Sequence, residues 1–265
     1  MLSRLREPVY LAAIAAGKVA FASIDLTVRA AGVEHLPRSG PVVLASTHVS
    51  FPDFLYVGDA LLPTGRLVRF LSRGDVWGSA PVGRAMDAMR HVPVDREAPA
   101  AAYLQARRLL AEDQVVCVFP EAGISAAYVV RSLMLGAVAL AREIGAPLVP
   151  VNVWGGQRLW GQKRSLDAPF PRPVLTRGRI IDVRIGEPLQ VPPDADLVRT
   201  TRELGRRLHE VQEQLQRLPE HVPRPGEYAP WYPAHLGGDA VERTASFALD
   251  RMPGSAVAPT WGPLR

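Results

Sequence analysis

The sequence contains very little cysteine and very little lysine. Cys117 is the single cysteine among 265 residues, so no disulfide can form within the chain, which is consistent with a reducing compartment. Lys18 and Lys163 are the only lysines among the 31 basic residues. The chain also has no C-x-x-C pair, no zinc-finger spacing and no RNP-like aromatic cluster. Without these patterns, a nucleic acid is the least supported class of partner.

The N-terminal apolar stretch does not predict a clean membrane-spanning helix. Residues 8–24 are almost wholly apolar, but they fall short of the ~20 residues that a bilayer requires, and Lys18 lies near their middle. We favour a helix that lies on or partly within one leaflet, with a helix packed on the protein body as the alternative. Arg4, Arg6 and residues 20–22 superficially match a signal peptide, but Lys18 argues against it.

The charge of the chain restricts its partners. A net charge of +5 and a pI near 9.8 favour acidic molecules, such as anionic lipid head groups, a phosphorylated substrate or coenzyme A. The apolar content of 48% is sufficient for a sizeable core, so the chain is not a disordered protein.

Short apolar runs alternate with helical patterns along the chain. Residues 42–45 and 115–119 are typical of buried parallel strands, and residues 99–113 carry helical spacing. This alternation predicts an α/β fold with a mostly parallel central sheet flanked by helices. An amphipathic helix is expected over residues 197–218, whereas the tail from Pro223 onward carries no strong element signal.

Three polar residues each follow the end of a predicted strand: His48, Arg96 and Glu121. The carboxyl ends of parallel strands meet at one edge of a sheet, so we expect these residues to converge there. A carboxylate five residues after the histidine, Asp53, can hold one ring nitrogen so that the other accepts a proton. Ser50 and Asp53 also fit a helix-capping pattern, and the two roles of Asp53 are compatible.

Four sequence blocks occur in the order found in the glycerolipid acyltransferase family, which includes the 1-acylglycerol-3-phosphate acyltransferases, and the chain resembles that family. H-x-x-x-x-D alone is a weak signal, but four blocks in order at these separations form a specific one. The blocks are His48 to Asp53, V-P-V-D-R at residues 92–96, F-P-E-A-G at residues 119–123 and V-P-V at residues 149–151.

The resemblance implies transfer of an acyl group from acyl-CoA or acyl-carrier protein to a hydroxyl of lysophosphatidate or a related lysophospholipid. It implies that His48 is the general base and that Asp53 orients it. It further implies that Arg96 grips the acceptor phosphate, while Glu121 and Gly123 shape the acceptor pocket. Backbone N–H groups after His48 are expected to assist an anion. The thioester is a co-substrate, and neither a cofactor nor a metal is expected.

The resemblance also suggests a division of the chain and a location. Residues 1–32 are interpreted as a membrane-associating helical segment, residues 33–222 as the catalytic domain and residues 223–265 as a Pro/Gly/Trp-rich extension. The expected location is the cytoplasmic face of the cell membrane, as a peripheral or monotopic protein.

Departures from the family pattern leave alternatives open. Ala122, Gly123 and Ile124 stand where the family usually has Gly-Thr-Arg, so a glycolipid acceptor is also compatible, with Arg131 as a possible substitute for the missing arginine. An inactive lipid-binding homologue is a further hypothesis.

A metal-dependent hydrolase is the other enzymatic alternative. His48 and Asp53 would supply two ligands to a cation, and His91 or Glu121 a third.

Overall fold

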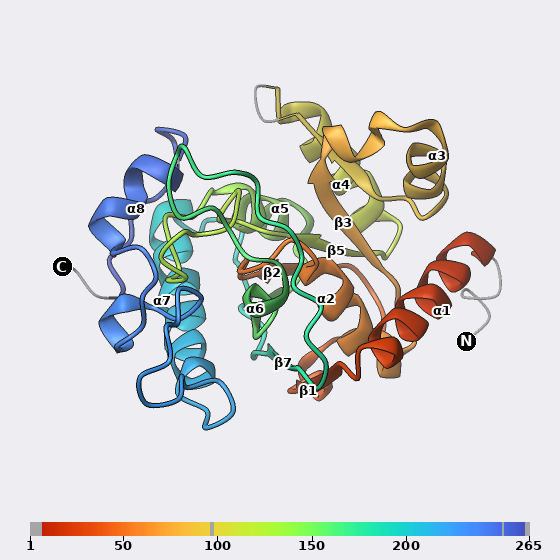
Figure 1. The fold of residues 1–265 in the computed structure, drawn as a ribbon. Helices are drawn as coiled ribbons and strands as arrows, with labels where there is room; N and C mark the ends of the chain where they lie inside the picture. The colour runs from red at the N-terminus through yellow and green to blue at the C-terminus, as the bar shows by residue number, and fades with distance from the viewer. Residues whose placement is uncertain (1–6, 96–97, 251, 263–265) are drawn as a thin grey trace.

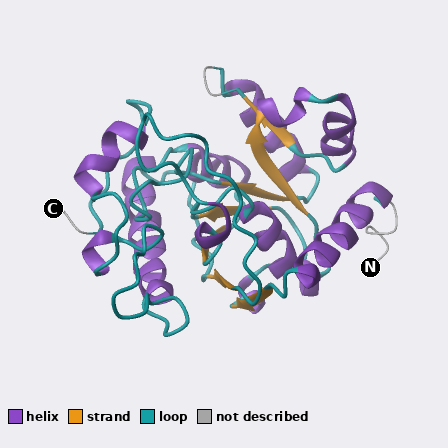
Figure 2. Cartoon of the chain, viewed as in Figure 1, coloured by secondary structure: helices purple, strands orange, loops and turns teal. Residues whose placement is uncertain are grey.

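A computed structural model describes residues 7–95, 98–250 and 252–262 of the chain. A central sheet lies between helices (Figures 1 and 2). The N-terminal helix and the C-terminal segment lie at opposite ends of the molecule in this view. The predicted α/β class is therefore correct.

Seven strands of the described chain form one sheet in the order β1-β7-β6-β2-β5-β3-β4. All neighbouring strands pair in parallel except β6 and β7, which are antiparallel. The strands are β1 (Thr27–Ala31), β2 (Val42–Ser46), β3 (Val68–Arg73), β4 (Val92–Val94), β5 (Val115–Val118), β6 (Leu148–Trp154) and β7 (Ile180–Ile185). We call the edge at which β2, β5 and β6 end the carboxyl edge.

Helices cover both faces of the sheet, as a mostly parallel sheet requires. Helix α2 contacts β1, β3, β6 and β7. On the other side, α4 contacts β4 and β5, α5 contacts β2 and β6, and α7 contacts β6. The helices are α1 (Pro8–Ser23), α2 (Asp53–Leu61), α3 (Ala80–Ala88), α4 (Ala100–Ala111), α5 (Gly136–Ile144), α6 (Gln157–Trp160), α7 (Leu197–Gln216) and α8 (Arg243–Asp250).

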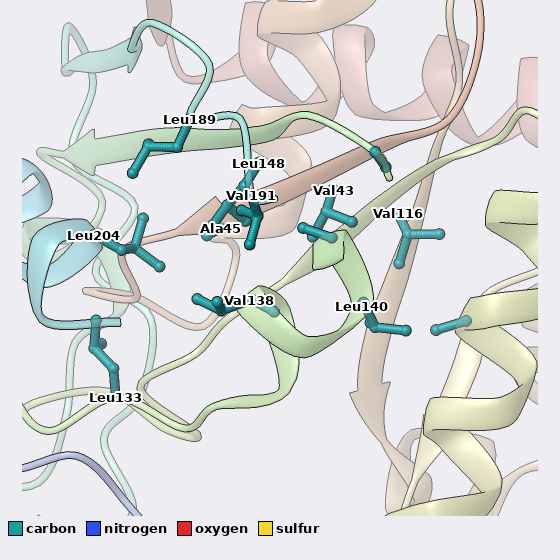
Figure 3. Packing of buried hydrophobic residues seen from close by; sticks show 14 of the residues in the cluster. Val43, Ala45, Val116, Leu133, Val138, Leu140, Leu148, Leu189, Val191 and Leu204 are labelled. Carbon is teal, nitrogen blue, oxygen red and sulfur yellow. The ribbon is translucent and has the colours of Figure 1, made fainter. Parts of the chain in front are cut away.

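Successive residues of β2 belong to different core clusters, because side chains alternate between the faces of a strand. Val43 and Ala45 pack with Val116, with Val138 of α5 and with Leu204 of α7 (Figure 3). The intervening residues of β2 pack in a second cluster with α2. These two layers hold the end of β2 in a fixed position.

Helix α1 has features of both favoured interpretations of the apolar segment. The Tyr10 hydroxyl donates a hydrogen bond of 2.8 Å to the Val68 carbonyl, and Lys18 Nζ lies 2.6 Å from Asp59 Oδ1, so one face packs on the body. The opposite side remains open, with Val19 70% exposed. Within the described residues, no helix has both the length and the apolar character required to cross a bilayer.

Three elements were not predicted, and the shortest of them is α6, which follows β6. Residues 27–31, which the sequence assigned to the N-terminal segment, form the edge strand β1 of the sheet. The tail beyond Pro223 contains α8, and its Trp261 is buried against Gly205 of α7. The tail carries no strong local signal, and its order comes from distant contacts: Asp250 of α8 accepts the Ala126 N–H, and Trp261 packs on α7.

Candidate active site

His48 lies in the turn that joins β2 to α2, at the carboxyl edge of the sheet, as predicted. Its Nδ1 is 2.9 Å from Asp53 Oδ2. Asp53 is fully buried, whereas the His48 side chain is 19% exposed. An ionised carboxylate can only accept hydrogen bonds, so Nδ1 carries the proton and Nε2 is left as an acceptor. The geometry is that of an oriented base.

Asp53 also organises the turn itself. Its Oδ2 accepts hydrogen bonds from the backbone N–H groups of Val49 at 2.7 Å and Ser50 at 2.8 Å. The Ser50 hydroxyl donates to Oδ1 of the same carboxylate. Of the predicted capping pattern, only the bond from the Ser50 N–H to the Asp53 carboxylate has formed. The Ser50 hydroxyl donates to Asp53 and does not accept a backbone N–H of α2. Asp53 both orients His48 and closes the turn.

The backbone N–H groups after His48 are not available to an anion. Those of Val49 and Ser50 are bound by Asp53, and the His48 N–H donates to Glu121 Oε1 at 2.9 Å. These three N–H groups therefore do not assist an anion, because two buried carboxylates already occupy them.

Glu121 follows β5 and joins that strand end to the His48 turn. Besides the His48 N–H, its carboxylate accepts the Arg131 N–H at 3.1 Å. Burial raises the pKa of Glu121 to about 7, although the Arg131 charge and both N–H groups act to lower it. Gly123 lies partly exposed in the loop that follows. Their roles in shaping an acceptor pocket stay predictions.

Arg131 is committed to the protein interior. Its Nε and Nη2 donate to the Glu121 carbonyl at 2.9 and 2.6 Å, and its Nη1 donates to the Asp250 carbonyl at 2.9 Å. Nη1 also lies 3.2 Å from the Asp250 carboxylate. With all its nitrogens engaged and 7% exposure, Arg131 does not replace the arginine missing from the third block.

A buried polar network behind the turn was missed by sequence reasoning. Thr47 Oγ1 accepts the Val153 N–H at 3.0 Å and donates to Gln212 Oε1 of α7 at 3.3 Å. Asn152 Nδ2 donates to the same Gln212 oxygen at 2.9 Å. Gln212 lies four residues after Leu208, on the apolar stripe of α7, so a polar residue on that stripe was the available signal.

Aromatic side chains extend from His48 towards a groove between α1 and α2. The His48 ring stacks on Phe119 at 4.4 Å, and Phe119 stacks on Phe70 at 6.5 Å between ring centroids. Phe70 lines the groove, which has a volume of about 100 Å³. Most of the lining is apolar and includes Tyr10, Ile14, Phe21, Phe54, Leu62 and Met86.

The remaining candidates are placed differently. Arg96 lies outside the described residues, although β4 ends at Val94 beside the end of β3. His91 is buried, and its Nδ1 accepts the Phe70 N–H at 3.1 Å. Burial and the nearby Arg69 charge lower its pKa to about 4, so it is a neutral core residue. No group of three or more His, Cys, Asp or Glu residues in the described chain is arranged to hold a metal ion.

Comparison with known proteins identifies the part of the chain that carries this site. Residues 27–154 match the Acyltransferase family. The matched residues contain the His48 turn, Glu121 and all four sequence blocks.

Named relatives support the same assignment. The 1-acyl-sn-glycerol-3-phosphate acyltransferase of Bacillus subtilis (strain 168) is 27% identical over 192 residues, which cover 70% of this chain and 88% of the relative. The chloroplastic 1-acyl-sn-glycerol-3-phosphate acyltransferase LPAT1 of Arabidopsis thaliana is 32% identical over 128 residues. That alignment covers 47% of this chain and 35% of the plant protein.

A solved structure has the same fold as most of this chain. It is the 1-acyl-sn-glycerophosphate (LPA) acyltransferase PlsC from Thermotoga maritima, with a TM-score of 0.65 and 21% identity. The match covers 82% of this chain and 84% of that protein. It extends well beyond residues 27–154, so elements outside the matched segment also share that fold.

Proposed function

We propose that the protein transfers a fatty acyl group from acyl-CoA or acyl-carrier protein to a hydroxyl of lysophosphatidate or a related lysophospholipid. One observation carries this proposal: Nδ1 of His48 is held by the buried Asp53, while the partly exposed ring leaves Nε2 to accept a proton. The names of the relatives support this choice of acceptor.

The reaction needs a base because an alcohol is a poor nucleophile at neutral pH. Nε2 of His48 removes the hydroxyl proton as the oxygen attacks the thioester carbonyl, and Asp53 stabilises the imidazolium that forms. The carbon–sulfur bond then breaks, and the leaving thiolate takes the proton from His48. The base is thereby regenerated without a covalent acyl-enzyme.

The fatty acyl chain occupies the groove between α1 and α2 in this proposal. The groove is lined largely by apolar side chains, and the stacked rings of Phe119 and Phe70 connect it with His48. Burying a chain of CH₂ groups there provides about 0.8 kcal/mol for each group removed from water.

Residues 8–23 hold the protein on a membrane surface, where a lipid acceptor is found. The support is the exposed apolar side of α1, which includes Val9, Leu11 and Val19. The net charge of +5 favours a bilayer that contains anionic lipids.

A transfer assay tests the catalytic proposal. Purified protein is incubated with labelled acyl-CoA or acyl-carrier protein and a panel of lysophospholipids and glycolipids, and the product lipid is identified. We expect wild-type product to contain the label, and His48→Ala to reduce turnover by about 10²–10⁴-fold. His235→Ala, which alters a histidine paired with Glu213 beside α7, is the matched control.

Two outcomes would support the competing hypotheses. Loss of activity on exhaustive chelation, restored by a divalent cation, would favour the metal-dependent hydrolase. Folded wild-type protein that binds lipid but transfers no acyl group to any acceptor would favour the inactive lipid-binding homologue.

A further inference from the structure

Four buried N–H donors near the carboxyl edge have no hydrogen-bond partner among the described residues. They lie on the end of β6, on α6 and just before β7, and they are Trp154 Nε1, Gln157 Nε2, Arg158 Nε and Arg179 Nε. The segments are neighbours, because Trp154 pairs with Asp182 in the β6–β7 ladder. The large majority of buried side-chain polar atoms have a partner, so this concentration of donors indicates a missing acceptor.

The same region carries more positive than negative charge. Arg158 Nη2 lies 3.3 Å from Glu227 Oε1, and its guanidinium lies 3.7 Å from the centre of the Trp231 ring. The charges of Arg179 and Arg224 also act on Arg158, and Glu227 is the carboxylate that offsets them. Burial, followed by the Arg179 charge, lowers the pKa of Arg158 to about 10. We call Arg158, Arg179 and Arg224 the arginine cluster.

The arginine cluster is open to solvent and joined to the candidate active site. Arg224 is exposed, and the Arg158 side chain is 17% exposed. Helix α6, which carries Arg158, contacts the His48 turn through a 3.1 Å hydrogen bond from the Phe51 N–H to the Trp160 carbonyl. A ligand at the cluster therefore lies along the same edge of the sheet as His48.

We propose that the arginine cluster binds a phosphoryl group. A phosphoryl group supplies negative charge and several acceptor oxygens, which match guanidinium donors in charge and geometry. Two molecules of the proposed acyl transfer carry a phosphoryl group, namely the nucleotide part of acyl-CoA and the phosphorylated acceptor. Naming these two as the sources rests on the proposed function. The binding site is distinct from Arg131, whose donors are all used internally.

The strand order favours the donor as the source. His48 stacks on Phe119, which follows β5 on one side of β2, whereas the arginine cluster lies beyond β6 on the other side. A phosphate held there lies on the opposite side of β2 from Phe119. In acyl-CoA the phosphates are separated from the thioester by the pantetheine arm, but in lysophosphatidate the phosphate is close to the reacting hydroxyl.

A binding experiment without turnover tests the cluster itself. Inorganic phosphate and adenosine 3′,5′-bisphosphate are titrated into the full-length protein by calorimetry. The double variant Arg158→Gln, Arg179→Gln and the single variant Arg224→Gln are compared with Arg207→Gln, whose side chain pairs with Glu203 on α7. We expect about tenfold weaker binding for the cluster variants and wild-type binding for the control.

Folding is checked by melting temperature, and Arg224→Gln changes an exposed side chain, so it remains informative even if the double variant is unstable. The proposal is overturned if wild type, Arg224→Gln and the folded double variant all bind each phosphate probe with the same affinity. Absence of any binding to wild type overturns it as well. These results are independent of acyl transfer, so a failure of the proposed function is recognised separately.

Steady-state kinetics then distinguish the two sources of phosphate. If the nucleotide is bound, Arg224→Gln raises the KM for acyl-CoA several-fold and leaves the KM for acyl-pantetheine, which lacks the nucleotide, unchanged. If the acceptor is bound, the KM for lysophosphatidate rises and that for acyl-CoA does not. Unchanged KM values for all three substrates contradict a role of the cluster in substrate binding.

Discussion

At the scale of single residues, Asp53 both holds the His48 ring and closes the turn that follows it. Asp53 accepts the ring N–H of His48 and the backbone N–H groups of Val49 and Ser50 on Oδ2 and the Ser50 hydroxyl on Oδ1, so the NH₂ group of Asp53→Asn deprives at least one buried donor of its acceptor. We expect turnover per folded molecule to fall by about 10²–10⁴-fold. The free energy of unfolding should also fall by about 1–3 kcal/mol. Transfer assays and urea unfolding measure the two effects, and wild-type turnover in a destabilised variant would leave only the structural task.

Glu121 gives the protein a specific pH dependence. The pKa of its carboxyl group is about 7 in the folded protein and near 4.5 in the unfolded chain, so the folded protein binds the carboxyl proton more tightly. The stabilisation is present below pH 4.5 and is lost as the pH rises towards 7. Glu121→Gln cannot titrate, so we expect its free energy of unfolding to vary less between pH 5 and 7. We also expect that free energy to be lower, because the N–H of His48 or of Arg131 then faces the amide NH₂ group. Urea unfolding across that range measures the difference, and parallel curves would contradict it.

Ala122 adopts a left-handed backbone conformation, with φ at +53°. Such a conformation costs an L-residue roughly 1–2 kcal/mol and costs glycine much less. The family pattern usually has glycine at this position, so we expect Ala122→Gly to stabilise the protein by about 1 kcal/mol. The control Ala101→Gly, at an exposed position in α4, should instead destabilise it by up to about 1 kcal/mol. Thermal unfolding distinguishes the two signs.

At the scale of elements, two helical glycines have opposite expected behaviour. Gly17 in α1 has open space where a Cβ would lie, so Gly17→Ala should stabilise the protein by about 1 kcal/mol through helix propensity. A Cβ at Gly205 in α7 would overlap the buried ring of Trp261. Gly205→Ala should therefore destabilise the protein and loosen the C-terminal segment. Unfolding curves and limited proteolysis of residues 223–262 test this contrast, and stabilisation by both variants would contradict it.

At the scale of the whole molecule, we expect the exposed side of α1 to mediate the proposed membrane binding. Leu11→Glu with Val19→Glu places charge on that side without touching Tyr10, which anchors the helix. We expect co-sedimentation with phosphatidylglycerol-containing vesicles to fall strongly while the melting temperature changes little. Val198→Glu, at an exposed position of α7, is the matched control. Undiminished co-sedimentation of the double variant would indicate another membrane-binding surface.

The sequence predicted those features that depend on residues close to one another in the chain. The strand over Val42–Ser46, the turn after it and the approach of Asp53 to His48 all arise within twelve residues. Gly145, with φ at +68°, ends α5, because glycine adopts the left-handed conformation of a helix end at little cost. In contrast, α8 and β1 are stabilised by partners that are distant in the sequence, and no local pattern predicted them.

By itself, the sequence determined the alternation of strands and helices and the local geometry of the His48–Asp53 pair, because hydrophobic periodicity and hydrogen bonds across five residues are local properties. Only the tertiary structure decided how that pair is supported. Glu121 reaches the His48 N–H from 73 residues away and Gln212 reaches Thr47 from 165 residues away. Such contacts depend on strand order and on which face a side chain occupies, and both are set by packing of the complete core.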